Sequence, residues 1–502
     1  MLILLIALPL LTGLAAALPF PSRRGRLTFL LTMQVIETAL VVWTLVSGRS
    51  YATNIWHLTE SLTIAMKLDG VAAVFSALTA VAWLLTLIYS VEYMSHSQNE
   101  ARFYVFLFLS EGMLLGTALS ADFVSMYVFY ELTSLCSMPL VLHELTHDAV
   151  TGAMKYLYYS IGGAFFVLFG IVVLYTNTST LDFAPGGTLI AGQHTGLELL
   201  AVFFVVLGFG TKAGLFPMHT WLPDAHSQAP SPVSALLSGV LLKCAMLVII
   251  RFYSLSIITV GDTYPRTLLL ILGTLSILVA ALCIFKQDDI KRRFAYSSVD
   301  NVGVVALCLG IGGPLGIAAC LLHCIFHGFT KALAFCMAGN IQHIYHTRDL
   351  NKIKGVVEIA PVTAALTIIA LLALPASPPF ALFISEFLTF VAGVQSGPIW
   401  VVVLVAIGLT GVYFALTGIA LKSIFGKAPE GMKRHEVPAL MIIPEIALAI
   451  VVMWFGIATP VAITSGVEDA TSVVLNQSVE ELHEAPLYRM VFSSQTKTSE
   501  VN

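Results

Sequence analysis

Residues 210–232, GTKAGLFPMHTWLPDAHSQAPSP, decide the fold class because they put a lysine and a helix break into an apolar chain. Lys212 follows the uncharged run LLAVFFVVLGFG, and Pro217 comes five residues after it. An ionised group inside a bilayer persists by pairing, by facing water or by losing its charge. A broken helix frees carbonyl groups that attract water and cations. The stretch therefore predicts an interrupted membrane helix at a site that binds or transfers ions. The alternative is that Lys212 snorkels to the membrane surface.

The composition supports a membrane protein. Of the 502 residues, 58% are hydrophobic and 11% are charged, and the mean hydropathy is +0.89, whereas soluble domains carry about 25% charged residues. The net charge of −4 gives no reason to expect nucleic acid as a partner. The seven cysteines form no Cys-x-x-Cys motif, so we expect no metal or cofactor and no catalytic centre in this chain.

Apolar segments of about 20 residues, the length that spans a bilayer, recur along the whole chain. The N-terminal segment precedes its basic cluster, so we interpret it as a retained helix and not as a signal peptide. A polar, acidic tail follows residue 460, and we expect a surface helix with a disordered end there. The fourteen predicted spans are 1–19, 28–47, 70–93, 103–120, 122–142, 152–175, 197–216, 232–254, 265–285, 294–312, 314–340, 358–394 (interrupted), 399–424 and 437–459.

The basic residues predict the orientation in the membrane. If the N-terminus is outside, the inner loops hold the basic clusters at 23–26, 286–293, 348–354 and 422–434. The long outer loop 177–198 then holds no basic residue. Because inner loops are enriched in lysine and arginine, we expect an integral protein of the prokaryotic cytoplasmic membrane with both termini on the outer side.

Other ionisable residues lie within the apolar segments. Glu131 has apolar flanks and would pair with a lysine or carry a proton, the alternative being a helix–helix hydrogen bond from a protonated acid. Lys243 lies deeper in its segment than Lys212, where snorkelling is harder. Three further acids without an obvious partner are expected to contact neighbouring subunits or lipid headgroups: Glu37, Glu111 and Glu445.

The segment LLHCIFHGFTKALAF places His323, His327 and Lys331 four residues apart. On a helix they form one polar stripe about 12 Å long. Histidine both donates and accepts protons near neutral pH, so the stripe is typical of a proton relay. Two core histidines and a metal site are the alternatives, although no carboxylate or cysteine completes a metal site on that face.

A second interruption, LLALPASPPFALFISEF, precedes Glu386. Paired interruptions in two halves of a chain are the mark of inverted repeats with the working site at the breaks. Glu386 would end the chain of charged groups or cap the broken helix as a protonated acid. Four residues are candidates for proton uptake, or ordinary polar groups: His219, Asp224 and His226 in the loop after Pro217, and Asp300 near a predicted helix end.

The sequence GTKAGLFPMHTWLPDAHSQAPSPVSALLSGVLLK closely resembles the signature of the antiporter-like subunits of respiratory complex I, Mrp antiporters and membrane-bound group 4 hydrogenases. The stretches KQDDIKRRFAYSSVDNVG and HCIFHGFTKALAF resemble later helices of the same family, and the likeness extends over about residues 70–425. Glu386 makes the chain similar to hydrogenase-4 F-type and M-type subunits. One departure is Asn301, where relatives often carry histidine.

The resemblance implies an all-α membrane fold of about fourteen helices, with two inverted five-helix repeats and two broken helices. We expect five segments along the chain. They are an N-terminal three-helix segment (1–100), a first repeat (101–255), a second repeat (256–425), a last transmembrane helix (426–460) and the polar tail (461–502).

The resemblance also implies a proton-translocating subunit of a redox-driven pump of the hydrogenase or NADH–quinone oxidoreductase type. Glu131 and Lys212 match the family's gating pair, Lys243 and the histidine–lysine stripe match its relay, and Glu386 matches its terminal group. The implied partners are further antiporter-like and other membrane subunits, a peripheral redox module, the lipid bilayer and protons. A sodium/proton antiporter subunit and a non-transporting scaffold are the alternatives.

Overall fold

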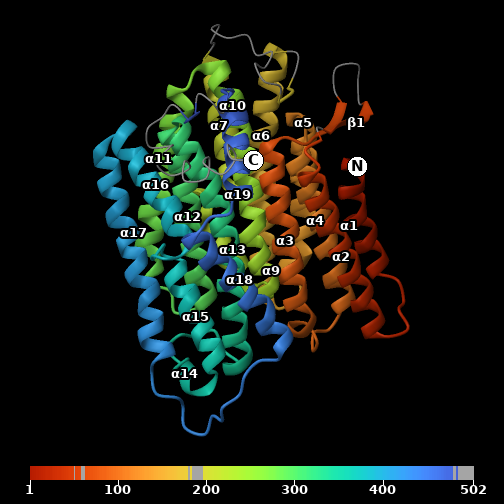
Figure 1. Cartoon of the computed structure of the whole chain (residues 1–502), viewed down its shortest axis with the longest axis vertical. Helices are drawn as coiled ribbons and strands as arrows, with labels where there is room; N and C mark the ends of the chain where they lie inside the picture. Colours follow the sequence, from red (N-terminus) through yellow and green to blue (C-terminus); the bar gives the residue numbers. More distant parts are fainter. Residues whose placement is uncertain (50, 58–62, 179–180, 184–195, 479–481, 484–502) are drawn as a thin grey trace, which may run out of the picture.

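The computed structural model describes residues 1–49, 51–57, 63–178, 181–183, 196–478 and 482–483. Its helices run mostly along one axis, with α1 and α2 at one edge of the bundle, α17 at the opposite edge and α13 between them (Figure 1). Besides helices and the loops that connect them, the described chain contains one two-stranded sheet and isolated bridges.

The elements before the first break are α1 (Leu2–Ala16), α2 (Arg23–Val46), β1 (Ala52–His57), β2 (Thr63–Lys67), α3 (Gly70–Tyr93), α4 (Glu100–Leu119), α5 (Phe123–Val141), α6 (His147–Thr178) and α7 (Gly196–Ala213). The central elements are η1 (Met218–Thr220), α8 (Trp221–Gln228), α9 (Ser231–Leu236), η2 (Leu237–Leu241), α10 (Leu242–Val260), α11 (Thr263–Ile284), α12 (Ile290–Ile311) and α13 (Gly313–Tyr345). The last are α14 (Val356–Ile359), α15 (Pro361–Ala373), α16 (Ala381–Ser396), α17 (Ile399–Ile419), η3 (Ala420–Ile424), α18 (Ala439–Ile457) and α19 (Val461–Leu475).

Within the described residues, 12 helices are long and apolar enough to cross a membrane, and α1, α15 and α16 are shorter apolar helices. The protein is therefore an integral membrane protein. Each predicted span falls on helical residues; three of them cover more than one element, namely 232–254 (α9, η2 and α10), 358–394 (mainly α15 and α16) and 399–424 (α17 and η3). The exact number of fourteen crossings stays a prediction, as do the five segment boundaries and the inverted repeats.

Both predicted helix breaks are present. At the first break, α7 ends at Ala213, and the next residue, Gly214, adopts a φ of 82°, a conformation that favours glycine. The second break lies between α15 and α16, where Pro378 and Pro379 cannot donate the hydrogen bonds that a continuous helix needs. Two further irregularities, the π-helical segments η2 and η3, were not predicted because no glycine–proline pair marks either of them.

The antiparallel hairpin of β1 and β2 was not predicted either. Its second strand buries Ile64 and Met66 against the bundle, and Met66 forms a bridge with Ser120 at the end of α4. The segment is too short and too mixed in polarity to show a clear period of its own.

The polar tail does form a helix, α19. It packs against α3, α10 and α13, and its buried residues include Val467, Ala470 and Val474. The expected disordered end falls outside the described residues.

Two helical stretches form the centre of the bundle. In the most apolar window of both Ser231–Ile257 and Gly313–Tyr345, every residue is buried. Polar side chains on these helices therefore face protein and not lipid, which brings the predicted relay residues into the interior.

Candidate ion-translocation site

Lys212 lies at the first break and is 2% exposed. Its ammonium group donates to the carbonyl oxygen of Tyr130 on α5 and lies 3.7 Å from the centre of the Tyr130 ring. Glu131, the next residue of α5, is half-buried and close enough to act on Lys212 electrostatically. The predicted partners are thus neighbours, but among the described residues the ammonium group binds the backbone beside Glu131 and not its carboxylate.

Lys243 is the second residue of α10, which directly follows η2, and it is fully buried. Its Nζ has no hydrogen-bond partner among the described residues. The thiols of Cys320 and Cys324 on α13 lie close enough to act on its charge. A buried ammonium group without a partner is costly. We therefore expect either a water molecule bound to Lys243 Nζ or a neutral amine at this position.

The predicted stripe on α13 is present and fully buried. The rings of His323 and His327 stack with centres 6.0 Å apart. Lys331 donates to the carbonyl oxygen of Phe294 at 2.6 Å and to the hydroxyl of Ser297. Both ring nitrogens of His327 lack a partner within the described part of the chain.

His323 is held between two helices that the sequence did not connect to it. Its Nε2 lies 3.1 Å from Asn301 Oδ1 on α12, and its Nδ1 lies 3.0 Å from Ser385 Oγ on α16. Asn301 therefore occupies the place beside the stripe at which the resemblance had marked a missing histidine.

Asp300 was expected near a helix end, and this was wrong. It lies in the middle of α12, is 2% exposed, and acts electrostatically with both Lys331 and Glu386. Its Oδ2 accepts from Asn301 Nδ2 at 3.3 Å. The sequence did contain a signal for this polar face, because Ser297, Asp300 and Asn301 follow helical spacing in an otherwise apolar segment.

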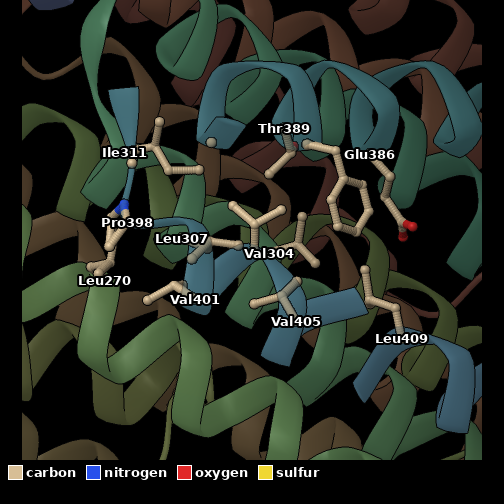
Figure 2. A pocket seen from close by; sticks show the side chains of 14 residues that line it. Leu270, Val304, Leu307, Ile311, Glu386, Thr389, Pro398, Val401, Val405 and Leu409 are labelled. Carbon is tan, nitrogen blue, oxygen red and sulfur yellow. The ribbon is translucent and has the colours of Figure 1, made fainter. Parts of the chain in front are cut away.

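Glu386 lies on α16 at the edge of a small apolar cavity of about 10 Å³, room for about one water molecule. Figure 2 shows Glu386 at one end of the lining side chains, with Ile311 and Pro398 at the other end. Thr389, one turn further along α16, bonds the thiol of Cys308 at 3.0 Å. Glu386 is close enough to Asp300 on α12 for the two acids to act on each other electrostatically.

A larger cavity of about 400 Å³ lies among the ends of several helices and is lined by Lys291, Glu144, Gln342 and Arg348, among others. Lys291 had been assigned to an inner loop, but it is 1% exposed. Its Nζ donates to the carbonyl oxygen of Ala229 at 3.0 Å. The sequence missed this residue because it lies in the basic run KRR, whose other two members are only half-buried.

His226 connects this region to the stripe. It is fully buried, and its ring stacks on Phe335 with centres 4.9 Å apart. The ammonium group of Lys331 lies 5.7 Å from the centre of the same Phe335 ring. Neither ring nitrogen of His226 has a partner in the described residues.

The other two uptake candidates lie elsewhere. Asp224 was expected in a loop, but it lies on α8, as does His226; it forms ion pairs with Lys155 at 2.6 Å and Arg292 at 2.7 Å. His219 is 6% exposed and lies beside the rings of Phe216 and Tyr296.

Two acids expected to face lipid or other subunits have partners inside the chain instead. Glu111 accepts from Gln34 at 2.6 Å, and Glu445 accepts from Asn340 at 2.8 Å. Glu37 is 1% exposed. Glu111 and Glu445 are met by polar residues on adjacent helices, which the pattern of one helix does not indicate.

Comparison with known proteins gives a consistent result. Residues 120–410 match the family described as NADH:quinone oxidoreductase/Mrp antiporter, TM, and residues 56–104 match NADH-Ubiquinone oxidoreductase (complex I), chain 5 N-terminus. The hydrogenase-4 component F homolog of Methylacidiphilum infernorum is 32% identical over 375 residues, which cover 71% of this chain and 77% of that protein. The Na(+)/H(+) antiporter subunit A1 of Staphylococcus haemolyticus is 30% identical over 84% of this chain, and the match spans 56% of that longer subunit.

Solved structures share the fold. A chain of the membrane-bound sulfane sulfur reductase, an archaeal respiratory membrane complex, superimposes with a TM-score of 0.87 at 23% identity, covering 96% of this chain and 98% of that one. A chain of the Mrp complex from Dietzia sp. gives 0.83 at 20% identity, covering 98% and 99%. A chain of Thermus thermophilus complex I gives 0.75 at 22% identity, covering 91% and 98%. The family match over residues 120–410 and the 32% identical hydrogenase-4 component F homolog show that the chain belongs to the NADH:quinone oxidoreductase/Mrp antiporter family of membrane subunits.

Proposed function

We propose that this chain translocates protons across the membrane as one subunit of a larger complex. The observation that carries the proposal is a series of ionisable side chains that lie on five helices and are almost all removed from solvent. Ionisable groups in a membrane interior are functional by default when they line one path. The series consists of Lys212, Lys243, His327, Lys331, Asp300 and Glu386.

Glu131 and Lys212 would form the gate. The ammonium group of Lys212 rests on the carbonyl oxygen and ring of Tyr130, one residue from Glu131. A carboxylate that approaches the ammonium group stabilises its charge, and a carboxylate that withdraws makes loss of the proton easier. The lysine side chain would rotate between the carboxylate of Glu131 and the carbonyl oxygen of Tyr130. This rotation would couple the loss of the ion pair with Glu131 to the release of a proton toward Lys243.

Water would complete the middle of the path. Lys243 and His327 present nitrogen atoms that have no protein partner among the described residues, and a water molecule needs two or more such polar contacts. Beyond Lys331, the side chains of Ser297 and Asn301 line the approach to Asp300. Glu386 would then release the proton at the far end.

Proton uptake would start in the 400 Å³ cavity. Lys291 lines it, and His226 lies between this region and Lys331 through the ring of Phe335. A histidine suits the role because its two nitrogens can accept and donate in turn. Asp224 would act only by holding Lys155 and Arg292 in place.

The relatives suggest the surroundings of the chain. The names and structures matched include a hydrogenase-4 component, an Mrp complex and respiratory complex I. We therefore infer membrane subunits, including further antiporter-like ones, and a peripheral redox module as partners. The basic inner loops favour the prokaryotic cytoplasmic membrane with both termini outside.

The test is a Lys243→Met variant in the assembled complex, measured in closed membrane vesicles. Proton pumping should be lost while assembly and electron transfer continue, because methionine keeps the apolar volume and removes the titratable group. Lys352→Met is the matched control, since the Lys352 side chain is 73% exposed. Full pumping in Lys243→Met would overturn the proposal, and pumping lost with intact electron transfer would exclude a passive scaffold.

A sodium/proton antiporter subunit is the second candidate. It is favoured by the likeness to the Na(+)/H(+) antiporter subunit A1 and by oxygen ligands at Glu131, Glu386 and the carbonyl groups of the breaks. Proton movement that depends on sodium and continues without redox substrate would favour this candidate.

A further inference from the structure

A second group of ionisable residues lies apart from the relay, on the N-terminal helices. Gln34 and Glu37 lie one turn apart on the buried face of α2, and Glu111 lies on α4. Gln34 and Glu111 are 0% exposed and Glu37 is 1% exposed. The mechanism proposed above uses none of these residues.

The contacts of this group leave four oxygen atoms without donors. The amide nitrogen of Gln34 donates to Glu111 Oε1 at 2.6 Å. No hydrogen-bond partner exists within the described residues for Gln34 Oε1, either carboxyl oxygen of Glu37, or Glu111 Oε2. Buried oxygens are almost always satisfied, so this arrangement indicates a bound species that supplies positive charge or protons.

The charge of the site is also unbalanced. Glu37 acts electrostatically on Glu111, and in the described chain no basic side chain acts on either acid. Glu131 differs from these two acids, because a basic side chain, Lys212, lies beside it. Two carboxyl groups with one shared proton keep a single negative charge, which one monovalent cation neutralises.

We propose that Gln34, Glu37 and Glu111 form a cation-binding site in which one sodium ion exchanges with a proton. Hard cations take carboxylate and carbonyl oxygens as ligands, and the four free oxygens are of these kinds. With the cation absent, a second proton takes its place, so that both carboxyl groups are neutral and their hydroxyl groups donate to the same set of oxygens. The amide of Gln34 orients its own carbonyl oxygen because its nitrogen is already committed to Glu111. The site does not depend on the relay through Lys243.

A carbodiimide that modifies protonated carboxyl groups in apolar surroundings tests the site. The face of α2 next to Glu37 is open, with Val35 54% and Ile36 40% exposed, so an apolar reagent can approach from lipid. Membranes that contain the chain in its complex are treated in sodium chloride or in choline chloride at equal ionic strength and pH. Modification of Glu37 and Glu111 is measured by mass spectrometry.

We expect sodium, at a concentration ten times its dissociation constant, to lower about tenfold the modification of the carboxyl group whose proton it replaces, whereas the other carboxyl group of the pair keeps the remaining proton. Glu445 is the internal control, because it is buried with a single amide partner. The acid that acts on it, Glu436, accepts hydrogen bonds from Val362 and Thr363, so sodium should not change the modification of Glu445. A Gln34→Leu variant keeps both acids and removes one ligand, so modification should persist while protection by sodium weakens.

Three results overturn the proposal. One is equal modification of Glu37 and Glu111 in sodium and choline salts, which leaves a site for protons only. Another is no modification in either salt at any pH. The third is unchanged protection in Gln34→Leu. Proton pumping is not the readout, so failure here and failure of the proposed function are distinguishable.

Discussion

The ammonium group of Lys212 binds the carbonyl oxygen of Tyr130, the residue immediately before Glu131. The lysine is therefore held beside its predicted counter-charge without being locked to it. A permanent ion pair would keep the lysine charged, whereas a backbone carbonyl and a ring hold it more weakly.

This relationship predicts the effect of removing the acid. Glu131→Gln should abolish proton pumping by the assembled complex while the chain remains folded, because the amide keeps the shape and removes the charge that controls Lys212. Pumping in closed vesicles is the measurement. Glu430→Gln, on an exposed loop, is the control and should pump normally; wild-type pumping by Glu131→Gln would contradict the gate.

The bridge between Asn301 and His323 predicts a positioning role. Asn301→Leu removes the acceptor at 3.1 Å from His323 Nε2, so the ring is held only by Ser385. We expect pumping to fall about tenfold, the loss that corresponds to one hydrogen bond of about 1.4 kcal/mol. Asn301→Gln or Asn301→His should recover part of it by supplying a polar group, a rescue that mere destabilisation does not explain.

The close packing of η2 on α13 predicts a stability effect. A Cβ on Gly239 would lie 2.8 Å from the carbonyl oxygen of Gly328, so Gly239→Ala must push the two backbones apart. The cost should be roughly 1–3 kcal/mol. Gly418→Ala is the control, because nothing lies within 4 Å of its Cβ. Thermal unfolding of the purified proteins in detergent measures both, and equal stability would refute the contact.

Breaking the buried ion pair of Arg251 and Asp69 should cost more folding stability than the Gly239 substitution does. Arg251 forms two hydrogen bonds of 2.7 Å to Asp69, and the two side chains are 5% and 10% exposed. Arg251→Met leaves the carboxylate buried without its partner, which costs roughly 3–5 kcal/mol. The exposed pair of Lys352 and Asp349 should contribute less than about 1 kcal/mol. Adding Asp69→Asn to Arg251→Met should restore part of the stability.

His143 predicts how stability depends on pH. It lies in the loop after α5 and is 4% exposed; burial, and to a lesser degree the charge of Arg102, lower its pKa from 6.5 to about 4. The unfolded chain takes up the proton first as the pH falls. The neutral histidine therefore contributes stability above pH ~6.5, and this is lost as the pH falls toward ~4.

A His143→Gln variant removes this titration. The fall in unfolding temperature on acidification should be smaller than in the unchanged protein, whereas His147→Gln, at an exposed position, should leave the fall unaltered. An identical fall in His143→Gln would show that other groups account for it.

Much of the fold could be predicted from local sequence. Apolar length identified the membrane helices, and Pro217, Pro378 and Pro379 identified both breaks, because a missing N–H acts on its own helix. The hairpin of β1 and β2 and the π-helical segment η2 were missed, since each depends on contacts with distant segments.

The candidate site, too, could be predicted from the sequence only in part. The sequence by itself determined which groups are costly in a membrane, namely Lys212, Lys243 and the stripe on α13, because the cost depends on residue type and depth. Only the tertiary structure decided their partners: the backbone of Tyr130 for Lys212, Asn301 and Ser385 for His323, and Gln34 for Glu111. Hydrogen bonds act over about 3 Å, so they are set by which helices pack side by side, and a single helix carries no record of its neighbours.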